Sequence, residues 1–311
     1  MKPVITVTLN PAVDKTVSVA GFRKGQDFRE QALSRSAGGK GIVVSRVLKL
    51  LGIPTLATGL LGGTDGAFIH QNLGKEKLPH SFTFIAGNSR TSLTILDPRS
   101  ENLTRIMERG PRVSLTELSR FRQKYLSLLK NTSCVVFSGR SIPGAPNTFY
   151  RDLIRHAQKR NIPTVLDTSG EPLLAGLRTK PLLIKPNLQE AEEIIGTRIS
   201  GTAGALRAAQ RCLHQGISLV CLTMGSRGAI VADHQTRVLA VPPKVQRKNP
   251  VGCGDAFIAG FLSVYLNRGN LRDAARRGVA CGTANSLSID PGVISRREVD
   301  RIQRKITIKN L

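Results

Sequence analysis

Residues 163–187 read PTVLDTSGEPLLAGLRTKPLLIKPN, and this stretch decides the fold. An apolar strand pattern over 163–167 leads into a helical pattern over 171–177, and a second strand pattern follows over 182–185. The same alternation extends outward to a strand over 134–138, a helix over 147–160 and a helix over 188–195. Strands separated by helical crossovers are typical of parallel sheets. We therefore predict an α/β fold with a doubly wound, mostly parallel sheet that helices flank on both faces.

Polar residues and glycines follow each of these predicted strands. In a sheet of this kind, ligands bind beyond the carboxyl ends of the strands, where the helical connections begin. We expect the polar segments to line one rim of the sheet. They are Ser138-Gly139-Arg140, Asp167-Thr168-Ser169-Gly170, Lys185-Pro186-Asn187 and Thr223-Met224-Gly225-Ser226.

The first hundred residues have a different pattern. After a first strand over 4–9, they suggest short strands with loops rather than full strand and helix units. The short strands are expected over 16–20, 27–34, 82–86 and 92–97. We predict a single domain over 1–311, with a small β lid from about 12–36 and 82–107 inserted in it. The exposed edges of such a lid could pair with a second copy of the chain, so we expect a homodimer.

The composition limits where this protein can work. The chain has 311 residues and 40% hydrophobic content, but its apolar runs are far shorter than the roughly 20 residues that span a bilayer. The N-terminus enters a strand pattern directly, without the pattern of a secretory signal, so we expect a cytoplasmic protein and no membrane partner. The five cysteines are far apart and odd in number, which indicates reduced thiols rather than a disulfide framework.

The charge of the chain indicates anionic partners. Lysine and arginine number 46 against 21 acidic residues, which gives a formal net charge of +25. This excess attracts phosphorylated metabolites and also favours nucleic acid without sequence preference. Aromatic residues make up only 4% of the chain, however, and there is no tryptophan to stack on unpaired bases. We therefore expect a small phosphorylated molecule, and not nucleic acid, as the partner.

Residues 249–257 read Asn-Pro-Val-Gly-Cys-Gly-Asp-Ala-Phe and combine a glycine-paired turn with the start of an apolar helical run. Unpaired backbone N–H groups at a helix start attract anions, and glycines let a phosphate come close. A carboxylate beside such a pocket repels phosphate, so Asp255 suits the removal of a proton from an attacking hydroxyl. The alternative is that Asp255 only interacts favourably with the helix dipole and that the glycines only turn the chain. Short glycine motifs have such a purely structural role about as often as a functional one.

The chain has two glycine-rich segments, Gly38-Gly39-Lys40-Gly41 and Gly252-Cys253-Gly254. The usual P-loop and dinucleotide fingerprints are absent around both, so another phosphoryl-transfer fold is needed. The chain resembles the ribokinase-like carbohydrate kinases along its whole length, specifically the phosphofructokinase B branch with 1-phosphofructokinases and tagatose-6-phosphate kinases. The resemblance is carried by residues 6–14, Gly38-Gly39-Lys40-Gly41, Ser138-Gly139, residues 167–171, Lys185-Pro186-Asn187 with Glu190, Gly225 with Gly228, and residues 251–255.

The resemblance implies the reaction centre and the nucleotide site. It makes Asp255 the catalytic base, with Gly252, Cys253 and Gly254 as the anion hole for the γ-phosphate of ATP. This agrees with the needs of phosphoryl transfer, which are positioning and neutralisation of charge. The implied ATP-binding residues are Lys185, Asn187, Thr223, Gly225, Gly228 and Asn285. Alone, the segment from Thr223 to Gly228 could equally be an ordinary strand turn.

Asn187 and Glu190 are candidates for holding Mg²⁺. They are one helical turn apart, so their side chains face the same way and could bind the ion through its waters. The alternative is a helix N-cap with an acid at its third position, which is a common sequence signature. Both roles are compatible with each other.

For the acceptor, Asp14 could accept hydrogen bonds from sugar hydroxyls, while Lys40 and Arg90 could bind a phosphate that the sugar already carries. Further substrate-binding candidates are Gly38, Gly39, Ser138 and, in the lid, Arg29, for which a solvated surface role is the alternative.

The chain departs from the family pattern at Val43, Ser92 and Met107, where the resemblance would place polar amides. Loss of a hydrogen-bonding amide changes which sugar is preferred. We expect a kinase that uses ATP and Mg²⁺ on a primary hydroxyl of a phosphorylated ketohexose: fructose 1-phosphate first, then tagatose 6-phosphate or fructose 6-phosphate. The alternatives are a nucleoside or unphosphorylated-sugar kinase, and a non-catalytic protein that senses sugar phosphates or associates with nucleic acid.

Overall fold

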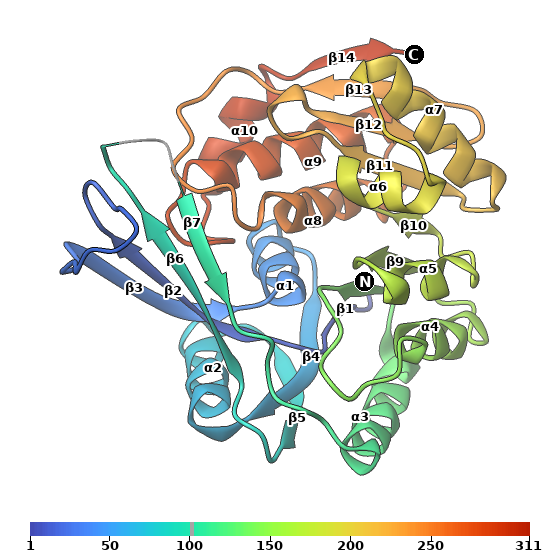
Figure 1. Cartoon of the computed structure of the whole chain (residues 1–311). Helices are drawn as coiled ribbons and strands as arrows, with labels where there is room; N and C mark the ends of the chain where they lie inside the picture. Colours follow the sequence, from blue (N-terminus) through green and yellow to red (C-terminus); the bar gives the residue numbers. More distant parts are fainter. Residues whose placement is uncertain (100–102) are drawn as a thin grey trace.

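A ten-stranded sheet, the main sheet, forms the centre of the computed structural model, which describes residues 1–99 and 103–311 (Figure 1). Its strands, in spatial order, are β14 (Thr307–Asn310), β13 (Arg237–Val241), β12 (Ala229–Ala232), β11 (Leu219–Thr223), β10 (Leu183–Ile184), β9 (Thr164–Asp167), β8 (Cys134–Ser138), β1 (Val4–Thr8), β4 (Thr55–Gly62) and β5 (His80–Ile85). Neighbours from β11 to β5 are parallel, and β12, β13 and β14 extend the sheet antiparallel. The prediction of a mostly parallel sheet is confirmed.

Helices cover both faces of the main sheet. They are α1 (Lys40–Leu50), α2 (Gly63–Lys75), α3 (Leu115–Leu128), α4 (Phe149–Gln158), α5 (Glu171–Leu177), α6 (Leu188–Ile195), α7 (Gly201–His214), α8 (Cys253–Tyr265), α9 (Leu271–Ser286) and α10 (Arg296–Gln303). The buried side chains of α3 to α7 pack in one cluster, and those of α1, α8, α9 and α10 pack in another. The doubly wound prediction is therefore confirmed.

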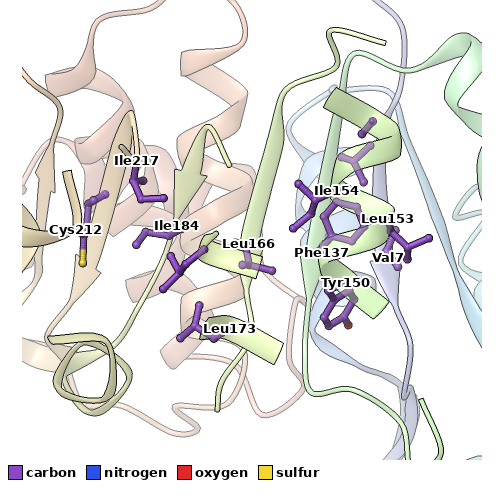
Figure 2. Packing of buried hydrophobic residues seen from close by; sticks show 14 of the residues in the cluster. Val7, Phe137, Tyr150, Leu153, Ile154, Leu166, Leu173, Ile184, Cys212 and Ile217 are labelled. Carbon is purple, nitrogen blue, oxygen red and sulfur yellow. The ribbon is translucent and has the colours of Figure 1, made fainter. Parts of the chain in front are cut away.

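The two clusters follow from the alternation of side chains along each strand. In β8, Val135 and Phe137 join the cluster of α3 to α7, whereas Cys134 and Val136 join the opposite cluster. Strand side chains point alternately to the two faces, so a strand that is apolar throughout must be covered on both sides. Figure 2 shows Phe137 near Tyr150 and Val7 in the first of these clusters.

The strand order reverses at β1. The chain leaves β1 for β4 and β5 on one side and later returns to its other side at β8. At such a switch point the connections after neighbouring strands diverge and open a crevice beyond the carboxyl ends. The polar segments that follow β1, β8, β9, β10 and β11 are therefore brought to one rim.

A second, smaller sheet lies beside this rim, at the left of Figure 1. Its strands, in spatial order, are β3 (Ala32–Gly38), β2 (Ala12–Ser18), β6 (Arg90–Leu96) and β7 (Leu103–Met107). The register places Asp14, Ser92, Arg105 and Arg90 on one face. The opposite face carries Val17 and its apolar neighbours, so the sheet has a polar and an apolar side.

One expectation for the first hundred residues is wrong. The sequence predicts a lid strand over 82–86, but β5 pairs in parallel with β4 in the main sheet. Helix α2 connects β4 to β5, so the segment completes a strand, helix and strand unit of the kind found elsewhere in the chain. Residues 100–102, which fall in the predicted lid range 82–107, lie outside the described residues. Within 1–99 and 103–311, no helix is both long and apolar enough to cross a bilayer.

Candidate active site

The first turn of α8 carries Asp255 into the crevice. Gly252 is the N-cap residue directly before α8. Its φ of 80° is a left-handed conformation that favours glycine. A Cβ on Gly254 would lie 3.0 Å from the Lys185 amine, so the missing side chain makes room for a cation beside the helix start. The N-terminal amides of α8, its dipole and the lysine together form a positive surface that suits a phosphate.

Asp167, at the end of β9, is the centre of the charged network. Its carboxylate forms ion pairs with Lys185 at 3.2 Å and with Lys40 at 3.4 Å. The Ser138 hydroxyl donates a hydrogen bond to the same carboxylate at 3.3 Å. Asp167 is only 1% exposed, so the low local dielectric strengthens these interactions.

Asp255 also approaches Asp167 closely enough for the two carboxyl groups to hydrogen-bond. Burial is the main cause that raises the pKa of Asp255 to about 7, and the charge of Asp167 adds to it, although Lys40 and Lys185 oppose the shift. For Asp167, burial acts in the same direction, but Lys185 and Lys40 outweigh it and lower its pKa. Asp255 is therefore the carboxyl group that can exchange a proton near neutral pH.

A cavity of about 580 Å³ opens in front of the α8 N-terminus. Its lining residues come from the segments after β10, β11 and β13 and from α8 and α9. They include Asn187, Thr223, Gly225, Gly228, Cys253 and Gly254, which the sequence assigned to the nucleotide and to the anion hole. The pocket also receives apolar side chains, among them Val245, Phe257 and Val279. A mostly apolar cavity with a polar end at a helix start fits a base and its phosphates.

Asn285, expected at the ATP site, supports the α8 loop from behind. It is 1% exposed, donates from Nδ2 to the Val251 carbonyl at 2.7 Å, and accepts from the Gly292 amide at 2.7 Å. Both ends of its amide are thus engaged by backbone. This geometry favours a positioning role for Asn285 over direct contact with a nucleotide.

Asn187 and Glu190 form a complete capping box at the start of α6. Asn187 Oδ1 accepts from the Glu190 amide, and Glu190 Oε2 accepts from the Asn187 amide, both at 2.9 Å. The cap alternative is therefore correct. It leaves the second carboxylate oxygen of Glu190, which lies close enough to Lys40 for its charge to raise the pKa of that amine.

Asp14 and Arg90 lie on the polar face of the smaller sheet. A Cβ on Gly38 would lie 2.2 Å from the Asp14 carboxylate, so this glycine makes space for the acid. Burial raises the pKa of Asp14, while Arg105, Arg46 and Arg90 oppose that rise. Arg90 donates from Nε to the Asn10 carbonyl at 3.2 Å and from Nη1 to the Glu108 carbonyl at 3.1 Å.

Two predicted substrate residues are placed differently from these. Lys40 is bound to Asp167, which puts its amine near Asp167 and Asp255 rather than beside Arg90. Arg29 is exposed in the connection between β2 and β3, next to the end where Ser18 pairs with Ala32. Asp14 lies toward the opposite end of β2, so the structure does not bring Arg29 to the Asp14 and Arg90 group of its own chain.

The departures from the family pattern have distinct surroundings. Val43 is 2% exposed, and its Cγ1 would lie 3.3 Å from a Cβ on Gly252, so it packs beneath the α8 loop. Ser92 accepts a hydrogen bond from Arg105 at 3.1 Å, and Met107 is 49% exposed. Arg105 had no role in the sequence analysis, because an arginine in a chain this basic is not distinctive. Asp167 was expected on the rim of the sheet. Its role as the partner of Lys40 and Lys185 was not expected and follows from the structure.

The chain is similar along its length to solved structures of phosphofructokinases. The chain is 26% identical to phosphofructokinase-2 from Escherichia coli in its tetrameric inhibited form, over 98% of this chain and 99% of that one, with a TM-score of 0.90. A complex of the same enzyme with fructose-6-phosphate gives 25% identity, the same coverages and a TM-score of 0.90. A protein described as a possible 1-phosphofructokinase from Thermotoga maritima is 25% identical over 99% of both chains, with a TM-score of 0.91.

The fold and the crevice define a sugar phosphotransferase: a parallel sheet with a switch point, a cavity at a helix start and a carboxyl group poised to take a proton. Residues 6–292 match the pfkB family of carbohydrate kinases, and the chain belongs to this family. Membership implies that ATP is the phosphate donor.

Proposed function

We propose that this chain transfers the γ-phosphate of ATP to a primary hydroxyl of a phosphorylated ketohexose. The observation that carries the proposal is the position of Asp255. Its helix start lines the donor cavity, and its carboxyl group lies beside Asp167 and Lys40. Lys40 is two residues from Gly38, which touches Asp14, so a short backbone segment joins the reaction centre to the acceptor residues.

In the proposed reaction, Asp255 takes the proton of the acceptor hydroxyl as the oxygen attacks the γ-phosphorus. The bond between that phosphorus and the β-γ bridging oxygen breaks, and its electron pair leaves with ADP. Lys185 and the amides of Gly252, Cys253 and Gly254 face the charge that develops on the transferred group. Burial around Asp255 keeps its proton affinity high enough for this transfer.

The residues present also fit Mg²⁺. Glu190 is 7% exposed and keeps one carboxylate oxygen outside the capping box, while Asn187 lines the donor cavity. Oxygen ligands at the edge of a phosphate site suit Mg²⁺, which retains several of its waters. When bound, the ion would neutralise charge on the phosphates of ATP.

Fructose 1-phosphate is our first candidate for the acceptor, followed by tagatose 6-phosphate and fructose 6-phosphate. Asp14 can accept hydrogen bonds from sugar hydroxyls, and Arg90 is one of three arginines, with Arg105 and Arg46, whose charges act on it. The similarity to a possible 1-phosphofructokinase and to phosphofructokinase-2 bound to fructose-6-phosphate supports acceptors of this class. Buried Val43 offers no hydrogen bond, which narrows the set of hydroxyl patterns that the site can satisfy.

We further propose that the chain forms a homodimer through the smaller sheet, which would act as a lid over the crevice. Leu33 of β3 is 49% exposed and Ile106 of β7 is 57% exposed. The register puts both on the apolar face with Val17 and Ile95. Exposed apolar side chains on edge strands favour burial against a second copy.

A coupled assay of ADP release over the three sugar phosphates tests the proposed reaction. We expect turnover on at least one of them and a fall of about 10² to 10⁴ in kcat for Asp255→Asn, because a general base contributes about that much. If the native protein and Asp255→Asn are equally slow on all three, the proposal is wrong. Turnover confined to unphosphorylated sugars or nucleosides would instead identify the alternative kinase.

A further inference from the structure

Arg46 of α1 joins three segments of the chain that are far apart in the sequence. Its guanidinium forms a two-pronged ion pair with Glu76, at the end of α2, through Nε to Oε2 at 2.7 Å and through Nη2 to Oε1 at 2.8 Å. Nη2 also donates to the Ala37 carbonyl of β3 at 2.8 Å, and Nη1 donates to the Pro291 carbonyl at 3.0 Å. The side chain is only 11% exposed. These bonds from a rigid, planar group hold the guanidinium in one orientation.

Pro291 lies in the segment 287–295, which connects α9 to α10 and is called the α9–α10 connection below. This connection touches β3 at a second point, because the Ser34 hydroxyl donates to Asp290 Oδ1 at 2.7 Å. The register puts Ser34 on the polar face of the smaller sheet. The bond from Ser34 and the bridge through Arg46 therefore both tie the smaller sheet to the α9–α10 connection.

The α9–α10 connection also supports the loop that precedes α8. Asn249 Nδ2 in this loop donates to the Ile289 carbonyl at 2.7 Å. The Gly292 amide donates to Asn285 Oδ1 at 2.7 Å, and Asn285 Nδ2 donates to the Val251 carbonyl at 2.7 Å. The same few residues that bind the smaller sheet on one side thus hold the start of α8 on the other.

Pro291 packs closely between Arg46 and the start of α8. A Cβ on Gly252, the N-cap of α8, would lie 3.0 Å from Pro291 Cβ. A Cβ on Gly292 would lie 3.2 Å from Arg46 Cδ. Close-packed atoms transmit displacement because they leave no space that could absorb it. A change in the position of the Arg46 side chain should therefore shift the loop that carries the reaction centre.

The proposed reaction makes the spacing between the two sheets important. Asp255 extends from α8 beside the main sheet, whereas Asp14 lies on the smaller sheet. A displacement of about 1 Å between reacting groups can lower a rate about a hundredfold. Arg46 binds β3 directly and supports the α8 loop through Pro291, so its length and shape set this spacing. A lysine would keep the positive charge but would lack the planar fork that reaches several partners at once.

We propose that Arg46 is a positioning residue that holds the smaller sheet at the working distance from Asp255, with the bond between Ser34 and Asp290 as a second support. This inference rests on the proposed function and adds residues that act through the α8 loop. Phosphorylation of a sugar needs the two sheets in register with each other. Slow hydrolysis of ATP by water needs only the donor cavity and α8, so loss of Arg46 should impair the first reaction far more than the second.

The ratio of sugar phosphorylation to ATP hydrolysis without sugar tests this proposal. For Arg46→Lys we expect kcat with the accepted sugar phosphate to fall at least about tenfold, while hydrolysis and KM for ATP stay within about twofold. Ser34→Ala should lower the ratio about two- to fivefold, since one hydrogen bond is lost. Calorimetric titration with ADP counts the folded nucleotide sites and should give the native stoichiometry. A merely structural role would instead reduce both rates and the number of sites together.

Two variants serve as matched controls. Arg277 is 12% exposed and pairs with Asp300 of α10, so Arg277→Lys alters an equally buried ion pair away from the smaller sheet. Ser127→Ala removes one hydrogen bond, to the Lys124 carbonyl within α3. Both should keep the native ratio.

The outcomes separate the two proposals. If the native protein phosphorylates a sugar and Arg46→Lys keeps the native ratio, the positioning role is wrong and the kinase proposal stands. The positioning role is also wrong if Arg277→Lys lowers the ratio as much as Arg46→Lys does. Should Arg46→Lys fail to fold, Ser34→Ala decides, and an unchanged ratio in that variant overturns the proposal. A native protein that phosphorylates no sugar overturns both.

Discussion

Asp167 and Asp255 place two carboxyl groups in one buried site, and the ion pairs with Lys40 and Lys185 both involve Asp167. Two neighbouring acids rarely ionise together in a low dielectric, so the site divides their roles. Asp167 keeps its charge and positions the lysines, whereas the pKa of Asp255 is about 7, close to neutral pH. Of the two, Asp255 is therefore the one that we propose as the base.

The pH dependence of the kinase should reflect this division. Asp255 must be ionised to accept a proton, so kcat/KM should rise with pH and level off above about 7. Asp167→Asn removes a charge that raises the pKa of Asp255, so the rising limb should move to lower pH even though the activity falls. Profiles measured from about pH 5 to about pH 9 decide this. An unmoved limb would show that the charge of Asp167 does not act on the base.

The same pKa shift predicts that Asp255 destabilises the folded protein. A carboxyl group whose pKa is higher when folded contributes stability that is present below the unfolded value and lost as pH rises through about 7. Asp255→Asn should therefore raise the free energy of unfolding at pH 8 by up to about 4 kcal/mol, and the gain should vanish near pH 4. Urea unfolding at both pH values tests this, with Asp27→Asn, at an exposed position, as the control. A gain that does not change with pH would contradict it.

Gly254→Ala should impair catalysis through the lysine beside it. The added Cβ would lie 3.0 Å from Lys185 Nζ and 3.2 Å from its Cε, so the amine must move away from the helix start. We expect kcat/KM to fall at least about tenfold, as for loss of one donor to the transferred phosphate. Gly74→Ala in α2 is the matched control, because nothing lies within 4 Å of its added Cβ. Equal kinetics in the two variants would argue against a phosphate site at Gly254.

Glu190→Gln separates helix capping from metal binding. Glutamine can replace glutamate in a capping box, so the melting temperature should change little, whereas loss of the charge should raise the Mg²⁺ concentration needed for half-maximal activity several-fold. Glu117→Gln changes the equivalent residue of the capping box at the start of α3, with Ser114, and should leave the Mg²⁺ requirement unchanged. Mg²⁺ titrations of activity compare the two. The same requirement in both variants would remove Glu190 from the metal site.

The oligomeric state can be tested at the apolar face of the smaller sheet. Leu33→Glu combined with Ile106→Glu places charges on two exposed positions of this face, so a dimer buried there should dissociate. Light scattering at micromolar concentration should give the dimer mass for the native chain and the monomer mass for the variant. Leu174→Glu, at a position on α5 that is 42% exposed, is the control. A native monomer, or a variant that stays dimeric, would exclude this interface.

Periodicity was sufficient for the elements of the main sheet because strand and helix alternate with strong apolar patterns. The expected helix over 171–177 coincides with α5, and the expected helix over 188–195 coincides with α6. The first hundred residues were harder, since the place of β5 in the main sheet depends on the crossover through α2, which is a tertiary feature. Strand propensity does not tell which of two sheets a strand joins.

The candidate site could be predicted where neighbouring residues form one local motif. Residues 249–257 are such a case, because the glycine-paired turn and the start of α8 with Asp255 lie next to each other in sequence. Other contacts of the site join residues that are distant in sequence. Asn285 binds Val251 and Gly292, Lys40 binds Asp167, and Arg105 binds Ser92. Long-range pairing of this kind leaves no local pattern in a single sequence.

The crevice is divided between two sheets: Asp14 belongs to the smaller one, and Asp255 extends from the main one. In the proposed reaction, the donor cavity and the base therefore belong to one sheet, and the acid proposed to align the sugar belongs to the other. A sugar would have to bridge the two sheets before its hydroxyl is oriented, so nucleotide bound alone should be hydrolysed slowly.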